Sequence, residues 1–471
     1  MTVPEDTIHP TPIHDPLTPP PSLARRSWRP FVARMHFYAG VLVAPFIIVA
    51  AITGGLYALS PVIERFVYDD ILLVEPSGPA IPLRDQAAAA QRAFPDLAMT
   101  GMRPATTEND STRIYFADPS LDEESLRAVF VDPYSGVVLG EEATWFGYLP
   151  LSTWLDGLHR HLNLGEPGRI YSEIAASWLW VVALGGLYLW LVKAASERRR
   201  NRAGRLVAVD RSATGRTRTL NWHGATGVWL LAGLLFLSAT GITWSTYAGA
   251  HVSDIRAALS WQRPQLDTAL SAAPAVDPSA IDYDGVLTAA SNVGVRRPVE
   301  VTLPAEPGEA VNVTEIDEPY RLTTNAAAID PTDLSVTGEL DYWRDYSLIA
   351  KLADWGIRAH MGFLFGLLNQ LLLLTVAVGL LTVIVRGYRM WWQRRPIRGS
   401  AWAVGRPPVR GGIRRLHPVT IAGVIIVAVA VGWFLPLLGL TLAAFVIVDL
   451  GVGAVKRRRV TTKQTKETSH V

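Results

Sequence analysis

Two short stretches, RMHFYAGV at residues 34–41 and NWHGATGV at residues 221–228, each contain a histidine followed four residues later by Gly-Val. A Thr-Gly pair then follows His36 and His223 at the same distance, as Thr53-Gly54 and Thr240-Gly241. A spacing that is shared over such a length is typical of an internal repeat, and a repeat decides the architecture of the chain. The sequence therefore predicts two copies of one unit.

The segments between the apolar runs repeat as well. VDPYSGVVLGE at residues 131–141 matches IDPTDLSVTGE at residues 329–339. A Trp-x4-His-x5-Gly pattern then occurs in each copy, with its histidine at His159 and at His360. Both copies run in the same direction, so the repeat is parallel rather than inverted. Each unit consists of a span, an intervening domain and a second span.

The apolar residues indicate a membrane protein. The chain has 471 residues, of which 49% are hydrophobic. They gather in uncharged runs of roughly 20 residues, which cross a bilayer core of about 30 Å as helices. The predicted fold is a mainly α-helical integral membrane protein with six spans, near residues 37–60, 174–192, 222–247, 361–385, 417–434 and 436–455. The last two form an added C-terminal hairpin.

The basic residues give the predicted orientation. Segment 193–219 holds nine Lys/Arg against two acids, and segment 386–416 holds nine Arg and no acid. By the positive-inside rule these loops are cytoplasmic, as are both termini. The predicted order is a disordered tail (1–30), a span (31–60), an outward domain (61–157), a histidine-bearing segment with a span (158–193), a loop (194–219), a span (220–247), a second outward domain (248–345), a histidine-bearing segment with a span (346–385), a loop (386–416), the hairpin (417–455) and a tail (456–471).

Each outward segment reads as a small α+β domain. The first has an alanine-rich helix near 84–94, followed by the strand-like stretches TRIYFAD, RAVFVD and VVLGE. The second has a helix near 283–291, followed by VEVTLP, AVNVTEI, TNAAAID and LSVTGE. Pro, Ser, Asp and Gly mark the turns between these stretches.

The absence of cysteine limits the chemistry. The chain has none, which excludes disulfides, thiolate-held iron–sulfur clusters and covalently attached c-type haem. A metal would have to be held by histidine or by carboxylates.

Four of the ten histidines occupy equivalent places in the two copies. His36 and His223 lie at the cytoplasmic entrances of spans, and His159 and His360 lie on the outward side. Two imidazoles at one depth on neighbouring helices can hold a haem iron from both faces. The alternative is that they are interfacial or packing residues. Zinc, which takes about four ligands, fits less well, since each level offers only two repeated histidines.

Other residues near the histidines suit a porphyrin. Gly40 and Gly227 lie one turn after their histidines on the same helix face, where a side chain would collide with the ring. Arg34, Arg160 and Arg358 could pair with haem propionates, or they could be ordinary interfacial anchors. His161 ranks behind His159 as a ligand, because it lies roughly 200° further round the helix.

The sequence resembles the PepSY-associated transmembrane family from about residue 30 to 396. The resemblance rests on the His-x3-Gly entry to the first span and on LHRHLNLGEPGR (158–169), SWLWVVALGGLYLW (177–190), HMGFLFGLLNQ (360–370) and RGYRMWWQRRP (386–396). It implies that the outward domains are PepSY domains. Some members of the family are inner-membrane reductases that carry two b-type haems and reduce iron held by siderophores.

We therefore expect a bacterial inner-membrane protein with two b-type haems that reduces an outward ferric substrate, as the resemblance implies. The electron donor would be a quinol or a separate reductase, because no dinucleotide-binding fingerprint is present. Lipid is the other expected partner, and no nucleic acid is. The alternatives are a membrane-anchored regulator whose PepSY domains bind a peptidase or another partner protein, and a siderophore or metal permease.

Overall fold

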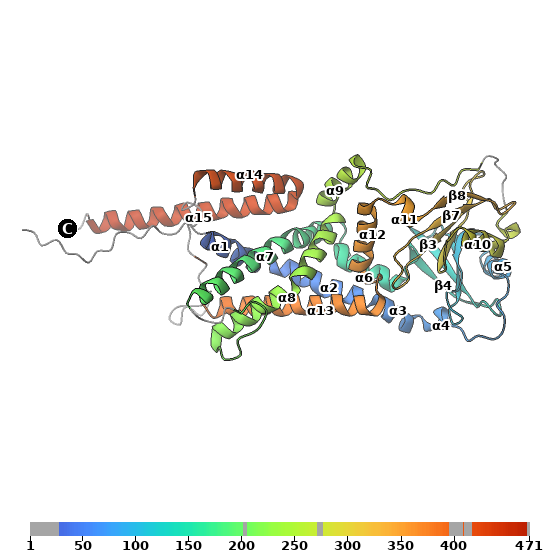
Figure 1. The fold of residues 1–471 in the computed structure, drawn as a ribbon, viewed down its shortest axis with the longest axis horizontal. Coiled ribbons are helices and arrows are strands. Elements are labelled where there is room, and N and C mark those ends of the chain that lie inside the picture. Colours follow the sequence, from blue (N-terminus) through green and yellow to red (C-terminus); the bar gives the residue numbers. More distant parts are fainter. Residues whose placement is uncertain (1–27, 201–204, 271–276, 395–407, 409–416, 469–471) are drawn as a thin grey trace, which may run out of the picture.

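The fold is an elongated bundle of helices with a β-sheet at one end (Figure 1). This computed structural model describes residues 28–200, 205–270, 277–394, Pro408 and 417–468. The predicted tail 1–30 and the loop 386–416 lie largely outside the described residues.

Apolar helices occupy all six predicted spans. Four are each long and apolar enough to cross a membrane: α7 (Glu166–Arg199), α8 (Gly215–Thr243), α13 (Gly366–Trp392) and the Pro436–Val455 part of α15 (Pro436–Thr468). A fifth candidate is the pair α1 (Arg29–Leu42) and α2 (Ala44–Ala58), which is bent by 57°. Pro45 lacks the N–H that a continuous helix would need at this bend. The sixth, α14 (Pro418–Phe434), is apolar but shorter.

The bundle and the C-terminal hairpin share one apolar core. It is formed by residues from α1, α2, α7, α8, α9 (Tyr247–Ala258), α13 and α15 and includes Val43, Ile47, Trp178, Leu234, Val376, Leu380 and Leu438. The hairpin is fixed to this core by a polar contact as well, because the Trp178 indole N–H donates to the Thr441 hydroxyl at 2.9 Å. Figure 1 shows α14 lying along α15, on the side away from α13.

The two α+β modules form a single antiparallel sheet of eight strands in the order β4-β3-β2-β1-β5-β6-β7-β8. The strands are β1 (Ala98–Arg103), β2 (Thr112–Ala117), β3 (Ser125–Val131), β4 (Val138–Trp145), β5 (Val299–Thr302), β6 (Val311–Glu315), β7 (Ala326–Ile329) and β8 (Val336–Leu340). Successive side chains of a strand point to opposite faces of the sheet. On β2, Ile114 and Phe116 pack into one core, and Tyr115 between them packs into another.

Two amphipathic helices cover one face of this sheet. They are α5 (Leu83–Ala93) and α10 (Tyr283–Asn292), which confirms both helices expected from the sequence. On α10 the buried positions Tyr283, Val286, Leu287 and Ala290 follow the i, i+3, i+4, i+7 spacing of one helix face. Each fully buried large side chain in this core contributes roughly 1.5–3 kcal/mol.

The two modules are joined by β1, a strand that the sequence patterns did not predict. Gly101 and Met102 of β1 pair with Thr302 and Val301 of β5. The backbones come so close that a Cβ at Gly101 would lie 2.4 Å from the Val301 carbonyl oxygen. An ion pair between Arg103 and Glu300, at 2.7 Å, crosses the same joint.

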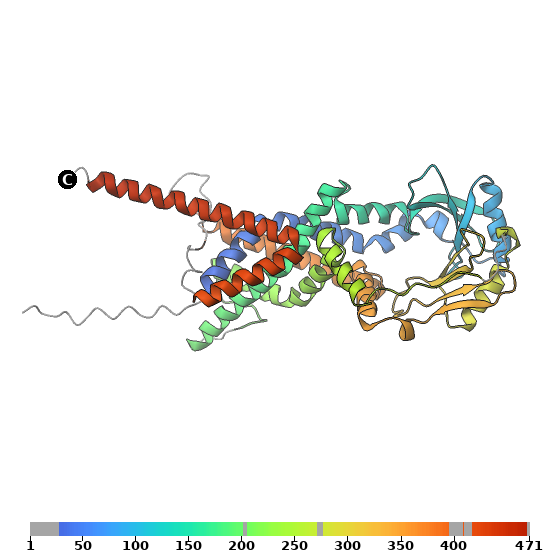
Figure 2. The same ribbon diagram turned by 90° about the horizontal axis from the view of Figure 1, so that it is seen from above.

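Short helices connect the sheet to the spans. They are α3 (Ser60–Val67), α4 (Asp69–Leu72), α6 (Pro150–His161), α9 (Tyr247–Ala258), α11 (Tyr342–Asp345), α12 (Leu348–Met361) and the 3₁₀ turn η1 (Pro278–Ala280). In Figure 2 α6 and α12 run from opposite sides of the sheet toward the spans. Each ends in a residue of left-handed conformation, Leu162 and Gly362, which turns the chain into the next span.

We expect Gly101→Ala to destabilise the joined sheet by about 1–3 kcal/mol, because the added methyl meets backbone rather than a movable side chain. The measurement is chemical unfolding of the detergent-purified protein followed by hydrogen exchange of β1 and β5. Thr302→Ala, an exposed change on the paired residue, serves as the control and should cost a few tenths of a kcal/mol. Equal stability of the two variants would contradict the close approach at Gly101.

Candidate functional site

The first pair of histidines lies between the spans. His36 on α1 and His223 on α8 have ring centroids 6.3 Å apart, with planes at 77°. The Nδ1 atom of each ring is hydrogen-bonded to a backbone carbonyl of a neighbouring span, Val182 on α7 at 3.0 Å and Val383 on α13 at 2.9 Å. A carbonyl only accepts, so both Nδ1 atoms donate and both Nε2 atoms keep a lone pair.

The second pair lies nearer the sheet. His159 in the last turn of α6 and His360 in the last turn of α12 also have centroids 6.3 Å apart, with planes at 44°. Here Nδ1 contacts threonine hydroxyls, Thr53 on α2 at 3.0 Å and Thr240 on α8 at 2.5 Å. Burial lowers the pKa of His159 to about 4 and the pKa of His360 to about 3, so both rings are neutral at pH 7.

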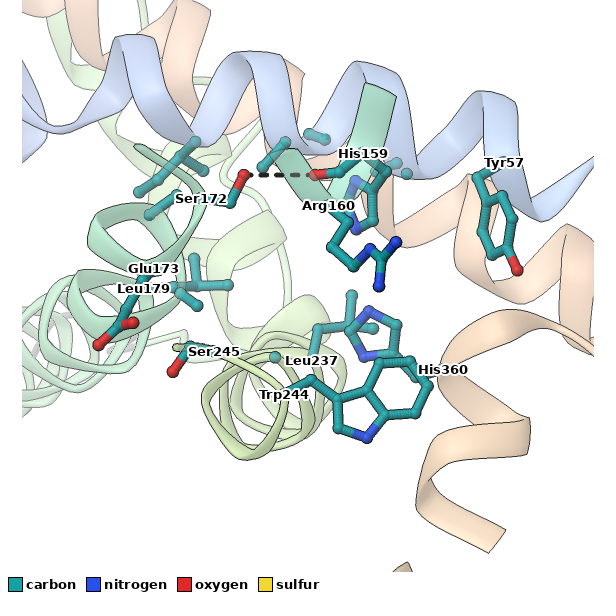
Figure 3. Close-up of a pocket in the computed structure, with 18 of the residues that line it drawn as sticks. Tyr57, His159, Arg160, Ser172, Glu173, Leu179, Leu237, Trp244, Ser245 and His360 are labelled. Atoms are coloured by element: carbon teal, nitrogen blue, oxygen red, sulfur yellow. Dashed lines mark hydrogen bonds between the residues drawn. The ribbon is translucent and has the colours of Figure 1, made fainter. Parts of the chain in front are cut away.

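A pocket of about 1330 Å³, counting the part open to the surface, surrounds the second pair. Its walls are mostly apolar and come from α2, α7, α8 and α13, while Asp156, Arg160, Arg169 and Glu173 supply charge. Figure 3 shows both imidazoles in this pocket, with Trp244 beside His360.

Glycines make room at both levels. A Cβ added to Gly40 or Gly227 would meet no atom within 4 Å, so the space beside these positions is open. At Gly54 a Cβ would lie 2.8 Å from Cε1 of His159, and at Gly186 it would lie 3.0 Å from Cε1 of His36. The first two glycines thus border a space beside the histidines, and the other two allow the rings to approach the helices.

Two of the three arginines expected near propionates are engaged elsewhere. Arg34 forms an ion pair with Asp449 of the hairpin and donates to the Pro408 carbonyl at 2.7 Å. Arg358 is buried against Asp317 and Asp354. Both guanidinium groups therefore have a structural partner within the chain.

The pocket itself holds Arg160, as expected, and Arg169, which the sequence patterns did not single out. Arg160 lies 3.2 Å from Asp156, whereas the Arg169 side chain has no hydrogen bond or ion pair with any described residue. Arg169 is the last residue of LHRHLNLGEPGR (158–169), a motif on which the family resemblance rests, and this position could have identified it from the sequence. His161 does not line the pocket.

The geometry of both pairs suits two axial ligands of one metal. A metal–nitrogen bond of about 2 Å on each side, with about 1.1 Å from ring nitrogen to ring centre, puts two such centroids roughly 6 Å apart. No group of three or more His, Cys, Asp or Glu side chains that could hold a bare ion is found in the described ranges. Two imidazoles at this separation would leave the other coordination positions of a metal to be filled by a cofactor that brings its own ligands.

Fold and site together define a duplicated, multi-pass membrane protein in which the two repeats share one sheet and contribute two pairs of histidines. The chain belongs to the family described as PepSY-associated TM region, whose model matches residues 33–394. This confirms the family resemblance. The match includes both histidine pairs and ends before α14, so the hairpin lies beyond the family region. A comparison with curated proteins finds no match.

We expect Gly54→Ala to displace His159 and to lower cofactor retention at the second pair, because its methyl meets the ring at 2.8 Å. Gly241→Ala, at the equivalent position of the other repeat, is the control, since its methyl meets only the Ala176 methyl at 3.3 Å. Haem content by pyridine haemochrome per purified chain is the measurement. A larger loss in the control would contradict this role for Gly54.

Proposed function

We propose that this protein is a membrane electron-transfer protein that binds two b-type haems, one between His36 and His223 and one between His159 and His360. The observation that carries the proposal is the geometry of these pairs: equal centroid separations of 6.3 Å and an acceptor on every Nδ1. A histidine that only packs or caps has no need of a second imidazole at ligand distance.

The proposal includes the orientation expected from the basic loops. With six spans and cytoplasmic termini in a bacterial inner membrane, the sheet faces outward and His36 and His223 lie near the cytoplasmic side. His159 and His360 then lie near the outer surface, below the sheet. Electrons from a quinol or a separate reductase enter at the first pair and leave at the second.

Each part of the chain has a role in this scheme. A bound haem supplies a one-electron iron couple at each level. The histidines orient it, and the apolar core around Trp178, Leu234 and Val376 keeps water from the space between the levels. Arg160 and Arg169 can bind propionates at the second pocket. The protein thus orients the haems and tunes their reduction potentials, and its side chains make or break no covalent bond.

The acceptor in this proposal is a ferric chelate, with a ferric siderophore as the candidate that the family suggests. Hard oxygen ligands hold ferric iron more tightly than ferrous iron, so the addition of one electron promotes release. The second pair suits this step because its pocket reaches the surface of the protein. The protein would then serve iron acquisition as a haem-dependent ferric reductase.

Purified from haem-replete cells, the protein should be red, with about two haems per chain and a reduced spectrum of bis-histidine b-type haem. Absorbance of the oxidised and dithionite-reduced protein, with pyridine haemochrome for the stoichiometry, is the measurement. A colourless protein would reject the proposal and favour the alternative of a membrane-anchored regulator.

Replacement of single ligands should assign the two haems. His36→Ala and His223→Ala should each remove the same spectral component, and His159→Ala and His360→Ala the other, leaving about one haem per chain. His251→Ala provides the control, because His251 binds the Phe434 carbonyl and lies in neither pair. The pairing is wrong if His36→Ala and His159→Ala affect one common component.

A further inference from the structure

The acceptors of the histidine Nδ1 atoms differ between the two levels. At the first pair they are main-chain carbonyls, of Val182 and Val383. At the second pair they are side-chain hydroxyls, of Thr53 and Thr240. The two threonines stand at the same distance after the first histidine of their own repeat. Each repeat therefore contains the same difference, a carbonyl acceptor for its first histidine and a threonine hydroxyl for its second.

The direction of the threonine contacts follows from where the hydroxyl hydrogens go. Thr53 Oγ1 donates to the Val49 carbonyl at 2.8 Å, and Thr240 Oγ1 donates to the Phe236 carbonyl at 2.8 Å. A hydroxyl has a single hydrogen, so with that hydrogen on the carbonyl each oxygen accepts from the imidazole. The outward rings consequently carry their proton on Nδ1, and Nε2 keeps its lone pair.

The contact at Thr53 is further supported by its neighbour. Thr53 is 5% exposed, and Gly54 beside it lets the His159 ring come closer than a Cβ would allow. The Thr-Gly pair thus combines an acceptor with the space that the acceptor requires. The Ala50 carbonyl, which also lines the pocket, is a second acceptor near the His159 ring, whereas Thr240 is the acceptor found for His360 in the described residues.

We propose that Thr53 and Thr240 are positioning residues that fix the outward histidines in the Nδ1–H form, and that their weaker acceptor oxygens make the second level the one of higher reduction potential. This inference rests on the proposed function. It adds to that function a direction of electron transfer, from the His36/His223 pair to the His159/His360 pair. Thr53 and Thr240, which accept hydrogen bonds from the second pair, set this direction.

The physical basis is the electron density at Nε2. A hydrogen bond donated by Nδ1–H raises the basicity of the ring, and the effect grows with the strength of the acceptor. An amide carbonyl is a stronger acceptor than an alcohol oxygen. More basic axial ligands favour ferric iron and lower the potential. One electron then moves from the first level to the second, while no bond forms or breaks and no proton is transferred.

Nearby charges do not cancel this difference. Arg386 lies near His223 and stacks on Trp222, and Arg160 and Arg169 lie in the pocket of the second pair. Cations that raise a potential are therefore present at both levels, and at the second the two arginines are accompanied by the carboxylates of Asp156 and Glu173. The charges therefore do not separate the two levels, and the acceptors decide which potential is higher.

The experiment is a spectroelectrochemical titration of full-length protein in lipid nanodiscs, in which the His36→Ala and His360→Ala variants assign the components. In the wild type the lower potential should belong to the His36/His223 component. Thr53→Val keeps the side-chain volume but removes the acceptor, so it should raise the potential of the second component alone. Thr53→Ser should restore the wild-type value. Thr375→Val is the matched control, since Thr375 donates only to the Leu371 carbonyl.

Each outcome decides a separate point. Selective loss of the second haem in Thr53→Val, with full retention in Thr53→Ser, would also support the positioning role. The inference is overturned if the lower potential belongs to the His159/His360 component. It is equally overturned if Thr53→Val leaves both potentials unchanged, or if Thr53→Ser and Thr375→Val shift them as much. If the wild-type protein binds no haem, the proposed function itself is rejected. If it binds two haems whose potentials do not shift in Thr53→Val, only this inference is rejected.

Discussion

Four hydrogen bonds from histidine Nδ1 atoms fix how the helices of the bundle are rotated against one another. In a membrane, rotation of an apolar helix costs little, because lipid and neighbouring helices are equally apolar. A buried donor without a partner costs about 1–3 kcal/mol. The bonds from His36 to α7, from His223 to α13, from His159 to α2 and from His360 to α8 therefore select one rotation for each helix. The ring separation of 6.3 Å in each pair is a consequence of that choice.

The eight-stranded sheet imposes a second constraint on the same site. Helices α6 and α12 follow β4 and β8, which are the two edges of the eight-stranded sheet, yet their histidines meet at 6.3 Å. The distance between the edges is set by how the halves join, and the join depends on the contact between Gly101 and β5. A stacking of Tyr148 on Phe363, at 5.9 Å, connects the two sides again below the sheet. The sheet thus sets the spacing of His159 and His360.

The sequence predicted the parts that carry local or repeated signals. Apolar runs located the spans, alternation located seven of the eight strands, and the duplicated spacing located the four histidines. It missed β1, because AMTGMR lacks alternation and contains a glycine, and it therefore missed the union of the modules. It also offered Arg34 and Arg358 for propionates, although their carboxylate partners are already within the chain. Partners that are far apart in sequence leave no local pattern.

The difference between RMHFYAGV and NWHGATGV can be explained by the hairpin. Position 34 is an arginine, whose cation pairs with Asp449 on α15, while the equivalent position of the second repeat is Asn221. The hairpin contacts α7 and α1, where Tyr38 also packs on Phe445 at 5.1 Å. At the equivalent position of the second repeat, Asn221 Oδ1 accepts from the Lys193 ammonium at 3.2 Å, and Lys193 is also paired with Glu197 at 2.8 Å. An arginine in place of Asn221 would lie beside the Lys193 cation instead of accepting from it. The duplication is therefore broken at the residue that binds the added helices, while the histidine and glycine beside it remain the same.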